Sequence, residues 1–159
     1  MGRIGIISSS GGHLTEALSI IEAFREHDVF LIAHGFPIVK GIQLIGVKRI
    51  YHLKIILGYS SWIAVVLTAL VNLFQVIRIF LIEKPSILFS TGAEIAIPIF
   101  YIGKVFFKTK LVFLESLARV NDLSYTGKFL YPIADLFLVQ WSELLKKAGP
   151  KAVYRGKLI

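Results

Sequence analysis

Short apolar runs alternate with helical patterns along the chain, and this alternation constrains the fold more than any other feature. The runs RIGIIS and DVFLIAH are rich in β-branched residues and have the length of strands. The stretch between them, HLTEALSIIEAF, places five apolar side chains on one helical face: Leu14, Ala17, Leu18, Ile21 and Phe24. These segments predict a strand, a helix and a second, parallel strand.

The same alternation continues toward the C-terminus. KRIYHLK, SILFST, KLVFLES and DLFLVQ are further strand candidates, and helical patterns cover residues 60–83, 93–107 and 126–133. Strands separated by helices predict an α/β fold, a Rossmann-like parallel sheet with helices on both faces and right-handed crossovers. Because no repeat or linker interrupts the pattern, we expect residues 1–159 to form a single domain.

The composition is more apolar than that of an ordinary soluble domain. Hydrophobic residues make up 55% and charged residues 18% of the chain, so we expect apolar surface to remain after the core is filled. The net charge of +8 favours an anionic membrane surface or a phosphorylated ligand, and we do not expect nucleic acid as a partner. The chain has no cysteine, so neither a disulfide scaffold nor a thiolate metal site can form.

Four strand candidates are followed by residues that can carry chemistry: SSSGGH, STGAEIAIP, LESLARVND and QWSE. In parallel α/β sheets, ligands bind beyond the carboxyl ends of the strands. Gly11 and Gly12 allow close approach of the backbone, and a helix beginning near His13 presents its N-terminus to a phosphate. The loop matches neither the dinucleotide fingerprint nor the P-loop, and a Gly-Gly turn also serves packing alone. A histidine there is either a base or a capping group.

Three stretches carry a family resemblance: SSSGGHLTEAL, STGAEIAIP and FLESLARVNDLSYTGKFLYPIADLFLVQWSEL. They resemble the acceptor-side, membrane-associated subunit of two-component UDP-sugar glycosyltransferases. That family includes the subunit that helps add the second N-acetylglucosamine to the dolichol-linked precursor, and the PssD-type proteins of bacterial polysaccharide synthesis. A more distant similarity runs to the N-terminal lobe of MurG. The resemblance implies the N-terminal, acceptor-binding half of a GT-B glycosyltransferase, with the donor-binding half in a separate chain.

The resemblance also implies a reaction. A sugar, N-acetylglucosamine first and glucuronic acid or galactose as alternatives, passes with inversion from a UDP-sugar to a polyprenyl-diphosphate-linked saccharide. The partner is a donor-binding subunit similar to the C-terminal GT-B lobe, and no cofactor is needed besides the donor substrate. The resemblance also implies no bound metal, and the sequence has no compact cluster of histidines and carboxylates that would argue otherwise. Two alternatives stay open. One is a non-catalytic membrane scaffold, and the other is a self-contained nucleotide-binding domain, which is weakened because Ala33 and His34 replace the expected acidic residue.

The family motifs assign roles to individual residues. His13 is the first candidate for the catalytic base, and Glu115 is the second. Residues matched to the acceptor and diphosphate site are Ser10, Gly11, Gly12, Thr91, Gly92, Glu94 and Arg119. Glu94 is expected in the first helical turn, where an acid is also a favourable partner of the helix dipole. Glu115 and Arg119 are spaced so that they can equally form a structural ion pair.

One segment is apolar enough to contact a membrane. Residues 62–82 reach the roughly 20 residues that span a bilayer, but Thr68, Asn72, Gln75 and Arg78 form a polar stripe along the helix. A crossover between two strands of one sheet argues against a spanning helix. We therefore expect a helix packed on the sheet that contacts lipid, with an ordinary buried crossover helix as the alternative. The expected lipid contacts are Trp62, Val66, Leu70 and Phe74.

The two ends of the sequence complete the expectations. The strand pattern begins almost at Met1 without a signal-peptide pattern, so we expect a peripheral or monotopic protein on the cytoplasmic face of the cell membrane, or of the ER membrane in a eukaryote. Residues 150–159 form a short tail after the Gly149-Pro150 break. We expect it to contact the donor-binding subunit, with a frayed tail as the alternative. The expected contacts are Tyr154, Arg155, Leu158 and Ile159.

Overall fold

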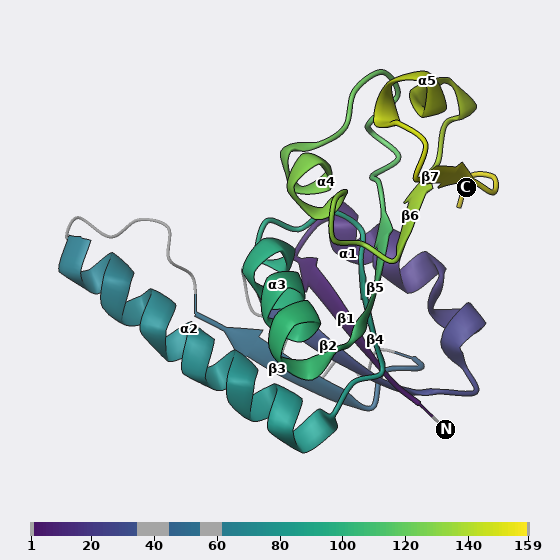
Figure 1. Cartoon of the computed structure of the whole chain (residues 1–159). Helices are drawn as coiled ribbons and strands as arrows, with labels where there is room; N and C mark the ends of the chain where they lie inside the picture. Colours follow the sequence, from purple (N-terminus) through teal and green to yellow (C-terminus); the bar gives the residue numbers. More distant parts are fainter. Residues whose placement is uncertain (1, 35–44, 55–61, 159) are drawn as a thin grey trace.

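The computed structural model describes residues 2–34, 45–54 and 62–158. Within these residues, seven strands form one parallel sheet in the order β3-β2-β1-β4-β5-β6-β7 (Figure 1). The strands are β1 (Arg3–Ser9), β2 (Asp28–His34), β3 (Arg49–Leu53), β4 (Ile87–Ser90), β5 (Lys110–Leu114), β6 (Leu136–Val139) and β7 (Ala152–Tyr154). The chain adds β2 and β3 on one side of β1 and β4 to β7 on the other, so the direction of winding reverses between β1 and β4.

Helices cover both faces of the sheet. Helix α1 (Gly12–Ser19) and the 3-10 turn η1 (Ile21–Phe24) lie on one face, and α2 (Trp62–Glu83) and α3 (Ala96–Phe107) lie on the other (Figure 1). The remaining helical elements are α4 (Tyr125–Leu130), η2 (Ser142–Leu144) and α5 (Leu145–Ala148). The predicted Rossmann-like α/β fold is therefore present.

Alternating side chains of the strands divide the core into two clusters. Ile4 and Ile6 of β1 point to the α1 side with Ala17, whereas Ile7 points to the α2 and α3 side. The second side holds the larger cluster, in which Phe80 of α2 and Phe100 of α3 are fully buried. This alternation follows the two-residue period of a strand, so a shift of one residue in register would exchange the two cores.

Helix α2 turns Asn72 and Gln75 of its polar stripe toward the end of β3, whereas Arg78 of the same stripe is exposed. The side-chain amide of Asn72 accepts a hydrogen bond from the Lys54 N–H at 3.0 Å and donates one to the Lys54 carbonyl oxygen at 2.9 Å. Gln75 donates to the carbonyl oxygen of His52 at 2.9 Å. These bonds attach α2 to the end of β3, and the apolar flank of the helix consequently faces outward.

Three predicted helices have different bounds in the structure, and the one expected over residues 126–133 is α4, which ends at Leu130. The first helix ends at Ser19 and continues as the separate turn η1, instead of running unbroken to Phe24. Helix α3 begins at Ala96, so Glu94 lies in the turn before it and not in its first turn. In that turn, the Ile97 N–H donates to the Glu94 carbonyl oxygen, and the side chain of Glu94 is exposed.

Candidate functional site

The turns that follow β1 and β4 meet where the winding of the sheet reverses. Strands β1 and β4 are direct neighbours, but their following helices, α1 and α3, lie on opposite faces. The two turns therefore diverge beyond the carboxyl ends of the strands and leave a crevice, which is the place where open α/β sheets bind ligands.

His13 and Thr91 hold these two turns together by a pair of hydrogen bonds. The Nδ1 atom of His13 lies 3.0 Å from the carbonyl oxygen of Thr91, and the Thr91 hydroxyl donates to the carbonyl oxygen of His13 at 2.7 Å. Because a carbonyl oxygen only accepts, Nδ1 must carry the proton. In the neutral ring, Nε2 is then the atom with a free lone pair.

Glycine is required beside this histidine. Gly92 has a φ of 124°, and a Cβ at this position would lie 2.9 Å from Cε1 of His13. Any side chain would therefore push the imidazole out of place as well as strain the backbone. Gly11, with a φ of 96°, turns the chain into α1. Both glycines were predicted from the sequence as site residues, and the structure places Gly92 against the His13 ring and Gly11 at the start of α1.

A cavity of about 390 Å³ opens at this crevice. Five residues that the sequence predicted for the site line it: Gly12, His13, Gly92, Glu94 and Arg119. Six others also line it: Glu16, Ser116, Ala118, Ser124, Tyr125 and Thr126. The first group comes from turns recognisable in the sequence. The second group includes Tyr125 and Thr126 at the start of α4.

The other predicted residues lie near the cavity without lining it. Ser10 and Gly11 are exposed at the tip of the first turn, where the Ser10 N–H donates to the His34 carbonyl oxygen at 3.1 Å. Thr91 is buried and acts on the cavity through its two bonds to His13.

Glu115 is buried behind the cavity and has no exposed surface. Its carboxylate accepts hydrogen bonds from the backbone N–H groups of Ser116 at 3.1 Å and Ser124 at 2.9 Å. Burial raises the pKa of Glu115, and the bonds from Ser124 and Ser116 and the charge of Arg119 only partly offset this. The carboxylate therefore closes the loop between residues 116 and 124 from the inside. Its use as a base stays a prediction, and its geometry favours a role in holding the loop.

Glu16 is a cavity residue that sequence reasoning missed. It lies one helical turn after His13 on α1, and its Oε1 accepts hydrogen bonds from the Ser116 hydroxyl at 2.9 Å and the Leu117 N–H at 3.1 Å. The spacing from His13 to Glu16 places both on one face of α1, which is a signal that the sequence contained. Its partner segment lies about 100 residues further along the chain, and no local pattern identifies it.

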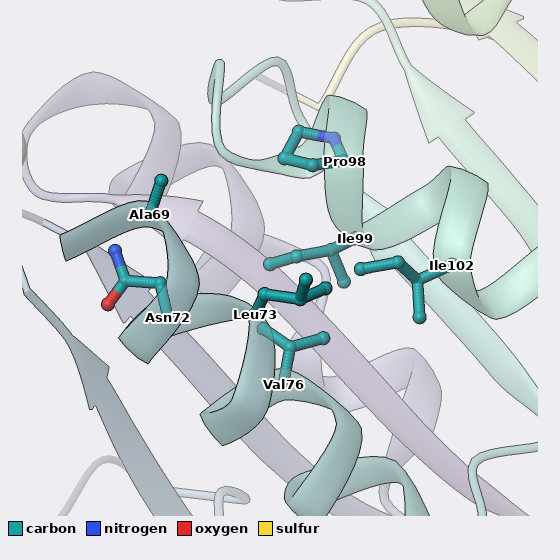
Figure 2. A pocket seen from close by; sticks show the side chains of 7 residues that line it. All are labelled: Ala69, Asn72, Leu73, Val76, Pro98, Ile99 and Ile102. Atoms are coloured by element: carbon teal, nitrogen blue, oxygen red, sulfur yellow. The ribbon is translucent and has the colours of Figure 1, made fainter. Parts of the chain in front are cut away.

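A second cavity, of about 130 Å³, lies between α2 and α3 and has an apolar lining (Figure 2). Ile99 and Ile102 of α3 point toward Leu73 and Val76 of α2. Around it, the outer flank of α2 exposes large apolar side chains, with Phe74 71% exposed. Of the predicted lipid contacts, Val66, Leu70 and Phe74 lie on this flank, whereas the side chain of Trp62 falls outside the described part of the structure.

Helix α2 is also long and apolar enough to cross a membrane. The window Val66–Glu83 meets this criterion by length and composition, and one third of it is buried inside the protein. A core helix can pass the same test, so the criterion alone does not separate a spanning helix from a packed one.

The C-terminal tail is packed against the sheet. Tyr154 ends the edge strand β7, and the Leu158 N–H donates to the side-chain oxygen of Gln140 at 3.1 Å. Lys157 places its ammonium 3.5 Å from the ring centroid of Trp141. Residues 155–158 therefore follow the sheet and are not frayed, while the predicted contact Ile159 lies outside the described residues. In the described part of the chain, no group of three or more His, Asp or Glu side chains is arranged to hold a metal ion.

Comparison of sequences identifies relatives that match this chain. The family described as "Oligosaccharide biosynthesis protein Alg14 like" matches residues 49–158. The mouse protein named UDP-N-acetylglucosamine transferase subunit ALG14 is 28% identical over 181 aligned residues, which cover 99% of this chain and 83% of the mouse protein. The human protein of the same name is 33% identical over 105 residues, covering 63% of this chain and 48% of its own length.

Comparison of structures identifies similar folds. MurG from Acinetobacter baumannii superimposes with a TM-score of 0.76 at 15% identity, over 97% of this chain and 45% of MurG. A UDP-GlcNAc 2-epimerase from Methanocaldococcus jannaschii gives a TM-score of 0.69 at 14% identity, over 98% of this chain and 45% of the epimerase. The chain thus spans just under half the length of either structure. This likeness confirms the predicted fold, which corresponds to one half of a GT-B architecture.

The sequence match confirms the family resemblance that the strand-end motifs indicated. The family model covers the region from the start of β3 to the C-terminal tail, which includes α2, the Thr91–Gly92 turn, the loop after β5 and the last two strands. Because this is most of the chain, the protein belongs to the Alg14-like family of oligosaccharide biosynthesis proteins.

Proposed function

We propose that this chain is the acceptor-binding, membrane-anchoring subunit of a UDP-N-acetylglucosamine transferase. The observation that carries the proposal is the pair of bonds between His13 and Thr91, which directs a free imidazole nitrogen at the reversal of the sheet. The matched relatives, named as subunits of such a transferase, support the donor and the reaction class.

The chemistry assigned to His13 is general base catalysis. Its Nε2 takes the proton from a hydroxyl of the acceptor sugar while that oxygen attacks the anomeric carbon of the donor. The new bond joins acceptor oxygen to anomeric carbon, the bond from that carbon to the diphosphate breaks, and UDP leaves. The Thr91 carbonyl oxygen keeps the ring in the required tautomer and stabilises the imidazolium that forms.

The acceptor is a polyprenyl-diphosphate-linked saccharide. Arg119 is exposed at the rim of the cavity, where its guanidinium can bind phosphate oxygens through two parallel hydrogen bonds. The N-terminus of α1 lies at the same cavity through Gly12 and favours negative charge. Both features support a diphosphate bound between α1 and the loop after β5.

The membrane contact is the outer flank of α2 together with the neighbouring end of α3. On this surface, apolar side chains face outward while Asn72 and Gln75 are turned inward to the end of β3. A helix with this orientation exposes its apolar side on the protein surface, and insertion into a lipid interface removes this apolar surface from water. The net charge of +8 favours the anionic cytoplasmic leaflet.

The donor-binding half is supplied by a partner subunit. The relatives are named as subunits, which supports a second chain in the active complex. The tail after β7 returns over the α1 face of the sheet, where Leu158 packs beside Leu114 and Leu138, and Arg155 and Lys157 are exposed. We assign this tail, with Tyr154 and Leu158, to the contact with the partner.

Sugar transfer from radiolabelled UDP-N-acetylglucosamine to a short-chain prenyl-diphosphate-linked N-acetylglucosamine tests the proposal. We expect product only when this chain and a donor-binding partner are both present, and none with either alone. A stable complex that gives no product with any UDP-sugar would contradict the transferase and favour a membrane scaffold.

Flotation with anionic vesicles tests the membrane contact. Phe74→Asp should weaken vesicle binding by about 10-fold or more, because an exposed phenylalanine contributes roughly 1.5–3 kcal/mol when it is buried in apolar surroundings. Leu136→Asp is the matched control, since Leu136 is exposed at the start of β6 while its neighbour Phe137 points into the core beneath α2 and α3. Equal binding of both variants and the wild type would exclude this surface as the contact.

A further inference from the structure

The loop between β5 and α4 is attached to the rest of the site by two glutamates. Glu115 holds both ends of the loop from inside the protein, through the backbone N–H groups of Ser116 and Ser124. Glu16 holds it from the opposite side, because its Oε1 receives the Ser116 hydroxyl and the Leu117 N–H. Ser116 thus lies between two carboxylates and is itself buried.

This attachment connects the two groups to which the proposed reaction assigns chemistry. Helix α1 carries His13 and Glu16 on one face, one helical turn apart, and the loop carries Arg119 three residues after Ser116. Arg119 is exposed, but its own loop is constrained: the Arg119 N–H donates to the Ser116 carbonyl oxygen at 2.9 Å. The position of Ser116 relative to α1 therefore sets the distance between the histidine and the arginine.

The bonds of Glu16 are placed where they control this distance. The indole N–H of Trp141 donates to the Leu117 carbonyl oxygen at 2.7 Å, so Leu117 is fixed from the β6 side, and Glu16 fixes it from the α1 side. Removing Glu16 would leave the loop attached to β5 and β6 but free to move away from α1. A displacement of about 1 Å between reacting groups can cost roughly 100-fold in rate.

We propose that Glu16 is a positioning residue, which fixes the loop bearing Arg119 against the helix bearing His13 and so aligns the acceptor diphosphate with the base. This inference rests on the proposed function and adds a residue to it. Glu16 acts through its Oε1. The second oxygen, Oε2, is buried and has no hydrogen-bond partner among the described residues, and the positioning role does not use it.

Hydrogen exchange tests the attachment without any need for activity. The Leu117 amide should exchange slowly in the wild-type complex, because its proton is bound to Glu16, and clearly faster in Glu16→Ala. Glu16→Gln should restore slow exchange, since its side-chain oxygen can accept the same two bonds. Unchanged exchange of Leu117 in Glu16→Ala would overturn the inference, whatever reaction the complex catalyses.

Steady-state kinetics of the same complexes test the consequence. Glu16→Ala should lower kcat/KM for the prenyl-diphosphate acceptor by about 10- to 100-fold and leave KM for UDP-N-acetylglucosamine unchanged. Glu16→Gln should recover most of the loss, and Ser116→Ala should cause a smaller loss that does not add to that of Glu16→Ala. Glu22→Ala, which removes an exposed glutamate outside the site, is the matched control.

Each contrary result has a distinct meaning. If Glu16→Gln has a kcat/KM as low as that of Glu16→Ala while its Leu117 amide still exchanges slowly, Glu16 acts on the substrate through its charge. That result would overturn the positioning role. Additive losses in the Glu16→Ala and Ser116→Ala pair would also overturn it, because they would show that the two residues act independently. A wild-type pair that transfers no sugar would overturn the proposed function instead.

Discussion

The amino and carboxyl ends of the strands use similar side chains but differ in how fully their polar groups are paired. At the amino end, Glu83 is 1% exposed and receives Arg49 Nε at 2.6 Å, a second Arg49 nitrogen at 2.9 Å and the Tyr51 hydroxyl. Arg3 lies 3.5 Å from the same carboxylate and donates to the last carbonyl groups of α2. This cluster joins β1, β3 and α2.

At the carboxyl end, polar side chains are held by hydrogen bonds to backbone atoms, and some of their hydrogen-bonding atoms have no partner. His13 is bound through Nδ1 and leaves Nε2 for another partner. The Oε2 of Glu16 and the Nε2 of His34 are buried without a hydrogen-bond partner among the described residues. At the amino end, the same holds only for the Oδ1 of Asp28, and there the Lys48 ammonium lies 3.6 Å away and supplies an ion pair. Residues that only maintain a fold are normally satisfied within it, and unsatisfied groups collect where a ligand binds. The comparison assigns stability to one end and chemistry to the other.

Replacing His13 should have the largest effect on activity and little effect on stability. His13→Ala in the assembled pair should lower kcat by about 10²- to 10⁴-fold, the usual contribution of a general base. The loss of one hydrogen bond to Thr91 should change the free energy of unfolding by only about 1 kcal/mol. The measurements are sugar transfer and the denaturant midpoint, and the control is His27→Ala, an exposed histidine near the amino end.

A result of the opposite kind would remove the distinction between the two ends. If His13→Ala keeps activity within about tenfold of the wild type, the base lies elsewhere, and Glu115 becomes the next candidate. If the variant unfolds, the bonds between His13 and Thr91 are part of the structural framework.

Replacing Glu83 should have the reverse effect. Glu83→Ala removes the carboxylate that pairs with Arg49 and Arg3, which both keep Asp28 as a partner. It should lower the free energy of unfolding by about 2 kcal/mol, the usual contribution of hydrogen bonds to a charged group, because the arginines are 37% and 42% exposed and stay paired. The rate of sugar transfer per folded complex should be unchanged. Glu22→Ala, which removes an exposed ion pair with Arg25, should cost at most about 0.5 kcal/mol. A Glu83→Ala complex that is stable but inactive would show that the amino end also serves catalysis.

The sequence predicted the parts of the site that depend on short stretches. Strands, the two glycine turns and His13 follow from local patterns, and the reversal of winding brings the turns together in any sheet of this order. The loop after β5 was also placed at the site, although Glu115 proved to be turned inward, where no sequence pattern distinguishes an exposed carboxylate from a buried one. Glu94 was predicted in the first turn of the following helix but lies two residues before α3 begins.

Contacts between distant segments could not be predicted. Glu16 and Leu117 are 101 residues apart, and Arg49 and Glu83 are 34 apart, so their pairing depends on the completed sheet. The polar stripe of α2 was visible in the sequence, but its direction was open until Asn72 was found bonded to Lys54. One helix face thus had two physically acceptable orientations, and only tertiary structure selected between them.

The contributions of carboxylates at the two ends to the free energy of unfolding should change with pH in opposite directions. Burial tends to raise the pKa of Asp28 at the amino end, but the hydrogen bond and charge of Arg49, with the charges of Lys48 and Arg3, outweigh burial and lower it. Its folded pKa lies below the unfolded value of 3.8, so its contribution is present above that pH and is lost as the pH falls through the folded pKa. Asp28→Asn should therefore cost about 1 kcal/mol at pH 7 and make stability less sensitive to acid.

Glu115 at the carboxyl end has the reverse sign because burial raises its pKa above 4.5. Its contribution is complete below pH 4.5 and is lost as the pH rises through the folded pKa, because the charged form is the one that burial penalises. Urea midpoints measured from pH 3 to 8 test both signs. The wild-type midpoint minus the Glu115→Gln midpoint should decrease as the pH rises. The wild-type midpoint minus the Asp28→Asn midpoint should decrease as the pH falls. The same trend in both comparisons would mean that the two ends do not differ in how they hold their carboxylates.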